Sequence, residues 1–242
     1  PMADFGYDVS DYRGVHPDFG TMETLDRLIA ACHRRGIRLL LDWVPNHTSE
    51  EHPWFIESRS SRGNPRRDWY VWRDAKADGS LPNNWLGVFG GPAWTLDEQT
   101  GQYYLHSFLK EQPDLNWRNP EVEAAMLDTL RYWFDRGIDG FRIDVIGMIV
   151  KHPQLADNPP NGEWLPGSLD RSSQKWVNNR NYPDVYDAVK RIRAVFDEYP
   201  GRMAVGEVFG TAAEVAGYYG RRDGQGLHLA FNFQLIHERE HG

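Results

Sequence analysis

Residues 140–145 read Gly-Phe-Arg-Ile-Asp-Val and end an apolar, strand-like run with charged side chains. Strand side chains alternate between faces, so Arg142 and Asp144 should point to the same side, with Gly140 leaving room behind them. Two other stretches have the same form, LLLDWVPNH at Leu39–His47 and AVGEVF at Ala204–Phe209. In parallel α/β proteins the carboxyl ends of strands carry the functional side chains. The three stretches therefore predict an enzyme.

Helical segments separate these strand-like runs. Capping residues and apolar periodicity predict helices from Thr21 to before Gly36, from Asn119-Pro120 to Gly137, from Pro183 to Tyr199, and a short one opened by Thr211 and Glu214. The predicted strands are Ile37–Trp43, Ile138–Asp144, Met203–Phe209 and Leu227–Phe233. Strands that alternate with helices indicate a parallel α/β sheet.

The candidate catalytic residues are polar side chains that end the three runs: Asp42, His47, Arg142, Asp144 and Glu207. Any one carboxylate here could instead be a core ion-pair partner of an arginine, but three such stretches in series favour chemistry. We expect the Arg142 guanidinium to hold Asp144 ionised, whereas the apolar run before Glu207 favours a protonated acid there. One ionised and one protonated carboxyl is the pair that glycoside hydrolysis uses.

The sequences of these stretches resemble the signature motifs of glycoside hydrolase family thirteen, the α-amylase family, within its oligo-1,6-glucosidase and α-glucosidase branch. The matching signatures are DWVPNH, GFRIDV, GEV, QPDLNW at Gln112–Trp117 and GYDVSDY at Gly6–Tyr12. The resemblance covers the whole chain, and the signatures stand in the family's order.

The resemblance implies a role for each matching residue. Asp144 would be the nucleophile and Glu207 the general acid and base, with the two carboxyls about 5 Å apart for a retaining double displacement. The residues that would bind the sugar are Asp4, Tyr7, His47, Arg142, Phe89, Phe108 and Gln112, supported by Asp42 and Asn46. Asp4 would hydrogen-bond the terminal glucose and Tyr7 would stack on it, which implies exo-action.

The resemblance also implies a partial (β/α)₈ TIM barrel, about strands 3 to 6, with a small domain inserted after the third. The expected divisions are 1–47 in the barrel, 48–117 inserted, and 118–242 in the barrel. Six tryptophans of the inserted region should mainly build its core: Trp54, Trp69, Trp72, Trp85, Trp94 and Trp117. The family's fourth signature, which carries a third carboxylate, is missing, so we expect this piece to be an internal fragment that is inactive alone.

The substrate stays open at this point. Val145, directly after the expected nucleophile, slightly favours α-1,6 over α-1,4 bonds by the resemblance. Glucosyl transfer or isomerisation of the sucrose or trehalose type would use the same residues, because a sugar hydroxyl can replace water. A remote alternative is a non-enzymatic, transporter-associated homologue, although such homologues have lost the catalytic acids.

Composition limits the classes of molecule that the chain is expected to bind. The chain has 242 residues, 40% of them hydrophobic, and a formal charge of −8, which argues against nucleic acid or an anionic membrane as a partner. No apolar run approaches the roughly 20 residues of a membrane span, and the opening PMADFGYDVS lacks signal-peptide features, which favours a cytoplasmic location. No spacing suggests a metal site, so we expect no cofactor, and an oligosaccharide as the partner. The sequence does not indicate an oligomeric state.

Overall fold

The computed structural model describes residues 1–162, 173–220, 224–231 and 233, which form two compact units. The first unit comprises Pro1–Ser10, Asn46–Val122 and Met148–Pro183, and the second Asp11–Pro45, Glu123–Gly147 and Asp184–Gly242. This grouping differs from the ranges 1–47, 48–117 and 118–242 in that residues 1–10, 46–47, 118–122 and 148–183 group with the inserted region.

The second unit is built on a parallel sheet. Its strands are β1 (Leu40–Trp43), β5 (Gly140–Ile143), β6 (Met203–Gly206) and β7 (Leu229–Ala230), in the order β1-β5-β6-β7. Every pair is parallel, which confirms the predicted α/β class. The strands are shorter than predicted because pairing begins only at the register Leu40 with Gly140, and Ile37 is 51% exposed. Of the predicted strand Leu227–Phe233, Asn232 lies outside the described residues.

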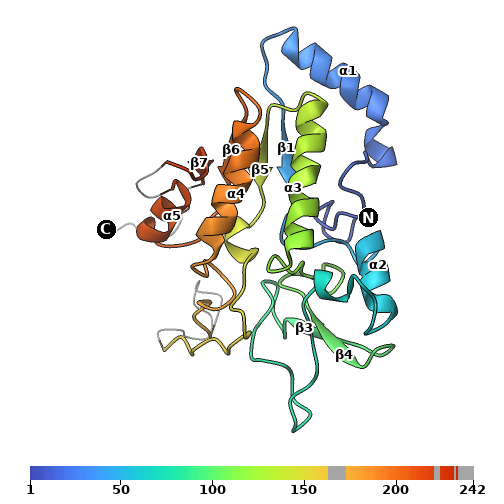
Figure 1. Cartoon of the computed structure of the whole chain (residues 1–242), viewed down its shortest axis with the longest axis vertical. Coiled ribbons are helices and arrows are strands. Elements are labelled where there is room, and N and C mark those ends of the chain that lie inside the picture. Colours follow the sequence, from blue (N-terminus) through green and yellow to red (C-terminus); the bar gives the residue numbers. More distant parts are fainter. Residues whose placement is uncertain (163–172, 221–223, 232, 234–242) are drawn as a thin grey trace, which may run out of the picture. The chain divides into compact units, whose positions relative to one another are not determined.

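Among the described residues, four helices accompany this sheet. Helix α1 (Met22–His33) precedes β1, and α3 (Pro120–Asp135), α4 (Val185–Asp197) and α5 (Ala212–Tyr218) each precede one of the later strands. Figure 1 shows α3 and α4 alongside β1, β5 and β6. Burial follows the predicted apolar stripes: Val122, Met126, Leu130, Trp133 and Phe134 on α3, and Val185, Val189, Ile192 and Phe196 on α4. Apolar packing therefore fixes the helices and, through them, the carboxyl ends of the strands.

The predicted helix caps are present. The Thr21 side chain accepts a hydrogen bond from the Thr24 backbone N–H, and the Thr211 side chain accepts one from Glu214 in a reciprocal capping box. The Asn119 side chain accepts the Glu121 N–H at 2.9 Å, directly before α3. These bonds satisfy helix N–H groups that have no partner within the helix, so local sequence decides where the helices begin.

The first unit contains a small antiparallel sheet of β2 (Trp72–Arg73), β4 (Gln102–Leu105) and β3 (Trp94–Asp97), in that order, and one helix, α2 (Pro53–Ser60). Short 3₁₀ turns lie at Pro17–Phe19, Arg67–Trp69 and Ile146–Met148. Five of the six tryptophans expected in this core are at most 8% exposed: Trp69, Trp72, Trp85, Trp94 and Trp117. Trp54 is half-buried.

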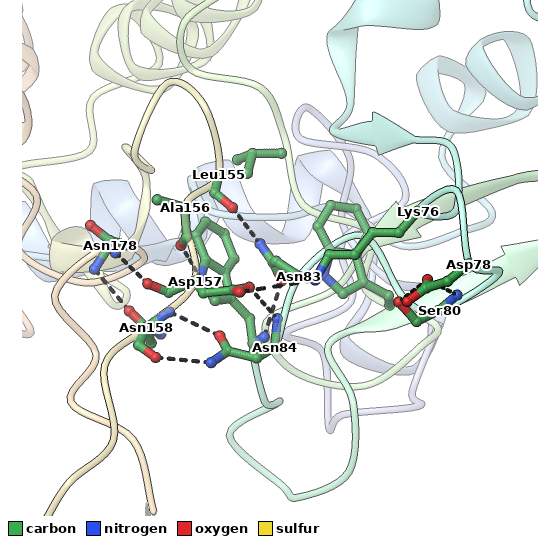
Figure 2. Close-up of polar contacts among 12 residues, drawn as sticks. Lys76, Asp78, Ser80, Asn83, Asn84, Leu155, Ala156, Asp157, Asn158 and Asn178 are labelled. Atoms are coloured by element: carbon green, nitrogen blue, oxygen red, sulfur yellow. Dashed lines mark hydrogen bonds and ion pairs between the residues drawn. The ribbon is translucent and has the colours of Figure 1, made fainter.

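The chain after β5 is tied into this first unit by asparagine side chains (Figure 2). Asn84 and Asn158 bond reciprocally, with Asn84 Nδ2 donating to the Asn158 carbonyl and the Asn158 N–H donating to Asn84 Oδ1, each at 2.8 Å. Asn83 Nδ2 donates to the Leu155 carbonyl at 2.9 Å. The segment between β5 and residue 184 is thus anchored here, and residues 163–172 of it lie outside the described chain.

No helix in the described part of the chain is long and apolar enough to cross a membrane.

Candidate active site

The second unit gathers the carboxyls of three predicted site residues around the guanidinium of a fourth, Arg142. Arg142 Nη1 lies 2.7 Å from Asp144 Oδ1 and 3.2 Å from Asp42 Oδ1, and Arg142 Nη2 lies 2.7 Å from Glu207 Oε2. Asp144 and Glu207 are largely buried, whereas the Asp42 side chain is half exposed. One arginine therefore bridges the two carboxyls that the sequence predicts to be catalytic.

Strand register places these groups together. Asp42 pairs with Arg142, and Arg142 pairs with Val205, across three neighbouring strands. Asp144 and Glu207 each follow directly after a strand end, and their backbone N–H groups donate to the Trp43 and Ile143 carbonyls at 2.9 Å. A Cβ at Gly140 would overlap the Met203 carbonyl oxygen, so glycine permits β5 and β6 to approach. The space that glycine was predicted to leave beside Arg142 and Asp144 is therefore filled by the backbone of β6.

Val145 turns the chain immediately after Asp144. Its φ of 35° lies in the left-handed region, which disfavours a β-branched residue by about 1–3 kcal/mol. In this conformation the Val145 N–H donates to Glu207 Oε2 at 3.3 Å. The strained turn thus contributes a second hydrogen-bond donor to the Glu207 carboxyl.

The protonation of Asp144 differs from the expectation based on Arg142 alone. Burial raises the pKa of Asp144 to about 7, and the neighbouring Glu207 carboxyl adds to the rise, while Arg142 opposes it. The guanidinium is shared among several carboxylates, so its effect on Asp144 is diluted. Asp144 therefore retains its proton up to about neutral pH in the structure without a bound sugar.

The first unit gathers a second cluster, which contains Asp4, Tyr7, His47 and Gln112. Gln112 Nε2 donates to Asp4 Oδ2 at 3.0 Å and to the Tyr7 carbonyl at 3.3 Å. His47 Nε2 lies 3.0 Å from the same Tyr7 carbonyl. Gln112 is fully buried, while Asp4 and Tyr7 are partly exposed. This cluster offers a carboxylate, an imidazole and an aromatic ring, which suits a sugar with hydroxyls and an apolar face.

Aromatic rings extend this second cluster. The His47 and Phe108 ring centroids lie 5.0 Å apart, and those of Phe108 and Phe89 lie 5.9 Å apart in an edge-to-face pair. Phe89 is 60% exposed, so its ring is open to a ligand.

Burial lowers the pKa of His47 to about 4, with Asp114 opposing the change. The imidazole is therefore neutral near pH 7. Asn46, predicted as a supporting residue, contacts it directly, because Asn46 Nδ2 lies 3.1 Å from His47 Nδ1.

Sequence reasoning missed two charged residues beside this cluster. Asp114 is fully buried and lies 2.8 Å from Nζ of Lys151, which is 4% exposed. Asp114 stands inside the QPDLNW signature between Pro113 and Leu115, which was the only available signal that this carboxylate is buried. Lys151 follows the apolar run Ile146–Val150, and no periodicity marks it as buried.

A stacked aromatic pair near Glu207 was also missed. The Phe209 and Phe233 rings lie 4.5 Å apart at an interplanar angle of 10°, and Phe209 is 40% exposed. A partly exposed phenylalanine two residues after a catalytic candidate was the available signal.

Over residues 1–162, 173–220, 224–231 and 233, no group of three or more His, Cys, Asp and Glu side chains is placed to hold a metal ion.

Comparison with known proteins places the chain in a family. The profile of the alpha-amylase catalytic domain matches residues 1–242. The chain belongs to the α-amylase family. This agrees with the resemblance in the signatures and confirms that the parallel sheet is part of that family's α/β fold.

Relatives in the α-amylase family include several glucosidases. The chain is 48% identical to a probable alpha-glucosidase of Rhizobium meliloti, over 98% of this chain and 44% of the relative. It is 44% identical to an oligo-1,6-glucosidase of Parageobacillus thermoglucosidasius, over 97% of this chain and 40% of the relative. The chain thus spans less than half the length of these relatives.

A solved structure shares the fold of this α-amylase-family chain. An alpha-glucosyl transfer enzyme, XgtA, matches with a TM-score of 0.92 and 44% sequence identity, over 98% of this chain and 45% of that one. The similarity therefore extends to nearly every residue described here.

Proposed function

We propose that the full-length protein is a retaining, exo-acting α-glucosidase of short oligosaccharides. The observation that carries this proposal is the pair of buried carboxyls, Asp144 and Glu207, held by Arg142 at 2.7 Å each. Two carboxyls at the ends of neighbouring strands are the minimal apparatus for double displacement at an anomeric carbon. The glucosidase names of the relatives support the same substrate class.

In the proposed mechanism an Asp144 oxygen forms a bond to the anomeric carbon while the glycosidic C–O bond breaks. Glu207 gives its proton to the leaving oxygen, and the products are a free alcohol and a glycosyl-enzyme ester. Water then attacks the anomeric carbon, Glu207 takes the proton of that water, and the bond to Asp144 breaks. Two inversions give net retention. The single proton of the carboxyl pair must lie on Glu207 in the reactive state.

Arg142 contacts both carboxyls of the pair and does not by itself decide which one carries the proton. Its guanidinium donates to Asp144 Oδ1 and to Glu207 Oε2 through different nitrogens, so it stabilises negative charge on either carboxylate. A sugar that approaches Asp144 favours the anion there, because positive charge develops at the anomeric carbon. The covalent intermediate is tested by stopped-flow burst kinetics with a nitrophenyl glucoside: a burst of nitrophenol supports the glycosyl-enzyme, and its absence at every pH argues against an accumulating intermediate.

We further propose that Asp4, Tyr7, His47 and Gln112 bind the terminal glucose, and that Phe108 and Phe89 line the same pocket. The Gln112 bonds to Asp4 and to the Tyr7 carbonyl support this assignment because they hold the carboxylate beside the ring-bearing segment. Exo-action is tested by offering soluble starch beside short oligosaccharides. Faster fragmentation of the starch backbone than release of glucose would refute it.

For linkage we propose a modest preference for α-1,6 over α-1,4 bonds. Val145 supports this by the family resemblance, and its left-handed turn beside Glu207 puts the residue next to the chemistry. The ratio of kcat/KM for isomaltose to that for maltose should fall in Val145→Ala and Val145→Thr. An unchanged ratio in both variants would remove Val145 as the determinant.

Glucosyl transfer is the second candidate, and the Phe209–Phe233 pair favours it specifically. Its partly exposed ring lies two residues after Glu207, and aromatic faces pack well against sugar rings, including the ring of an acceptor. The named activity of the similar solved enzyme is also transfer. Product analysis at high substrate concentration decides between them: new oligosaccharides indicate a transferase and glucose alone indicates a hydrolase.

We also propose that residues 1–242 alone are inactive. Hydrolysis of an α-glucoside by this piece at a rate within about tenfold of the full-length protein would contradict this.

A further inference from the structure

Three polar side chains, those of Lys151, Asn46 and Asp114, form a buried network with the His47 ring. Lys151 Nζ donates to Asn46 Oδ1 at 2.7 Å and lies 2.8 Å from Asp114 Oδ2. Asn46 Nδ2 lies 3.2 Å from Asp114 Oδ1 and 3.1 Å from His47 Nδ1. Lys151, Asn46, Asp114 and His47 are all at most 4% exposed. Water therefore cannot substitute for a misdirected partner in this network.

The ammonium and the carboxylate fix which way the Asn46 amide points. With Oδ1 toward Lys151 and Nδ2 toward Asp114, every contact joins a donor to an acceptor. The flipped amide would direct its N–H groups at the ammonium and its oxygen at the carboxylate. Both contacts would be repulsive, so Nδ2 must face the His47 ring.

The fixed amide in turn decides where the neutral His47 ring carries its proton. Asn46 Nδ2 is a donor, so His47 Nδ1 must accept and cannot hold a proton. Nε2 then holds the proton and faces the Tyr7 carbonyl, an acceptor, at 3.0 Å. The alternative Nδ1–H ring would face a donor at Nδ1 and turn a lone pair toward a carbonyl oxygen at Nε2.

Gln112 is compatible with this assignment because its two Nε2 hydrogens go to Asp4 Oδ2 and to the Tyr7 carbonyl, which leaves none for His47 Nε2 to accept. Its Oε1 accepts the Leu109 N–H at 3.0 Å, and its Nε2 donates to Asp4 Oδ2 at 3.0 Å, so this amide has one orientation. Its Nε2 lies 3.0 Å from His47 Nε2 because both nitrogens approach the same Tyr7 carbonyl.

We propose that Lys151 and Asn46 are positioning residues that hold His47 as the neutral Nε2–H tautomer, so that the ring donates a hydrogen bond to a glucose hydroxyl. The role of the ring in binding glucose rests on the proposed function, whereas the tautomer does not. The groups that face the ring are Asp4, Tyr7 and Gln112 on one side and Asn46, Asp114 and Lys151 on the other. None of these contacts requires a charged imidazole.

The direct test is the protonation of the ring nitrogens in the full-length protein, measured by NMR after selective ¹⁵N labelling of histidine. The His47 signals are assigned by their loss in His47→Gln. The proposal predicts a protonated Nε2 and an unprotonated Nδ1 from pH 5 to pH 9. A proton on Nδ1 of the wild-type ring would overturn the proposal, and this result needs neither activity nor a variant of the buried network.

The variant test uses Asn46→Asp, which keeps the shape but replaces Nδ2, the donor that faces both His47 Nδ1 and Asp114 Oδ1, with a carboxylate oxygen. The ring should then carry a proton on Nδ1, and KM for the glucoside should rise by about tenfold, the effect of one misdirected buried hydrogen bond. Asn179→Asp is the matched control. Asn179 is 2% exposed, and its Oδ1 accepts a hydrogen bond from Asn158 that an aspartate could also accept.

The control should leave both the ring signals and KM as in the wild type. An Asn46→Asp protein with the wild-type tautomer and KM would refute the positioning role. A changed tautomer with an unchanged KM would refute only the contact of His47 with glucose. Failure of the proposed glucosidase activity would appear separately, as a folded wild-type protein that releases no glucose.

Discussion

Lys151→Met is the perturbation that should most affect stability, because it removes a buried charge and leaves its partner behind. The methionine has similar length and no charge. Asp114 would keep its hydrogen bonds from the Ser107 N–H at 2.8 Å and from the Asn46 amide at 3.2 Å. It would lose its ion pair with the Lys151 ammonium at 2.8 Å. Breaking one side of a buried ion pair costs about 3–5 kcal/mol. We expect the free energy of unfolding to fall by that amount.

A second substitution separates charge from packing. In Lys151→Met/Asp114→Asn no buried charge remains, so at least half of the lost stability should return, because neutral pairs of similar shape avoid the desolvation cost. If the loss came only from poor packing of methionine, the double variant would be no more stable than the single one.

Urea unfolding followed by tryptophan fluorescence measures both effects in the full-length protein, since five buried tryptophans of the first unit report on this region. A shift of under about 1 kcal/mol in Lys151→Met would refute the reasoning, because it would mean that the pair contributes no more than an exposed ion pair does.

Three further predictions concern the second unit. Gly140→Ala should destabilise by about 1–3 kcal/mol, since its Cβ would meet the Met203 backbone, whereas Gly206→Ala meets only the side chains of Leu227 and Ile146 and should cost less; equal urea midpoints would contradict this. Burial opposes ionisation of Asp139, but hydrogen bonds from the Leu39 N–H, His33 and Arg38 outweigh it and lower the pKa of Asp139. The stability that ionised Asp139 contributes is therefore present above the unfolded pKa of about 3.9 and is lost as pH falls through the folded pKa. Asp139→Asn should be less stable than the wild type at pH 7, and its melting temperature should fall less between pH 7 and pH 3. The raised pKa of Asp144, about 7, makes the wild type lose stability as pH rises from about 4, the unfolded value, to about 7; Asp144→Asn should abolish that loss, and parallel melting-temperature profiles of the two proteins would refute it.

Much of the fold could be predicted because it depends on local signals. Thr21, Asn119 and Thr211 cap helices through side-chain bonds within three residues of themselves, so sequence alone reveals them. The α/β class follows from the alternation of helices and strands. Strand ends were less predictable because pairing, not apolarity, defines them: Ile37 is apolar yet exposed, and the ladder begins at Leu40.

The candidate site was predictable where side chains follow strand ends in sequence. The contacts of Arg142 with Asp144 and Glu207 follow from the alternation and register of neighbouring strands. Lys151 was not predictable, because its partners Asn46 and Asp114 are 105 and 37 positions away in the chain and no local pattern records such a pairing. The protonation of Asp144 also required the structure, since it depends on the balance between burial and a shared guanidinium.

The most direct test of the central proposal is glucose release from isomaltose and maltose by the full-length protein beside its Asp144→Asn variant. The account predicts release by the wild type, and a loss of several orders of magnitude in kcat in a variant with wild-type circular dichroism and no loss of stability. A folded variant that still releases glucose within about tenfold of the wild-type rate would show that Asp144 is an ion-pair partner of Arg142 and not the nucleophile.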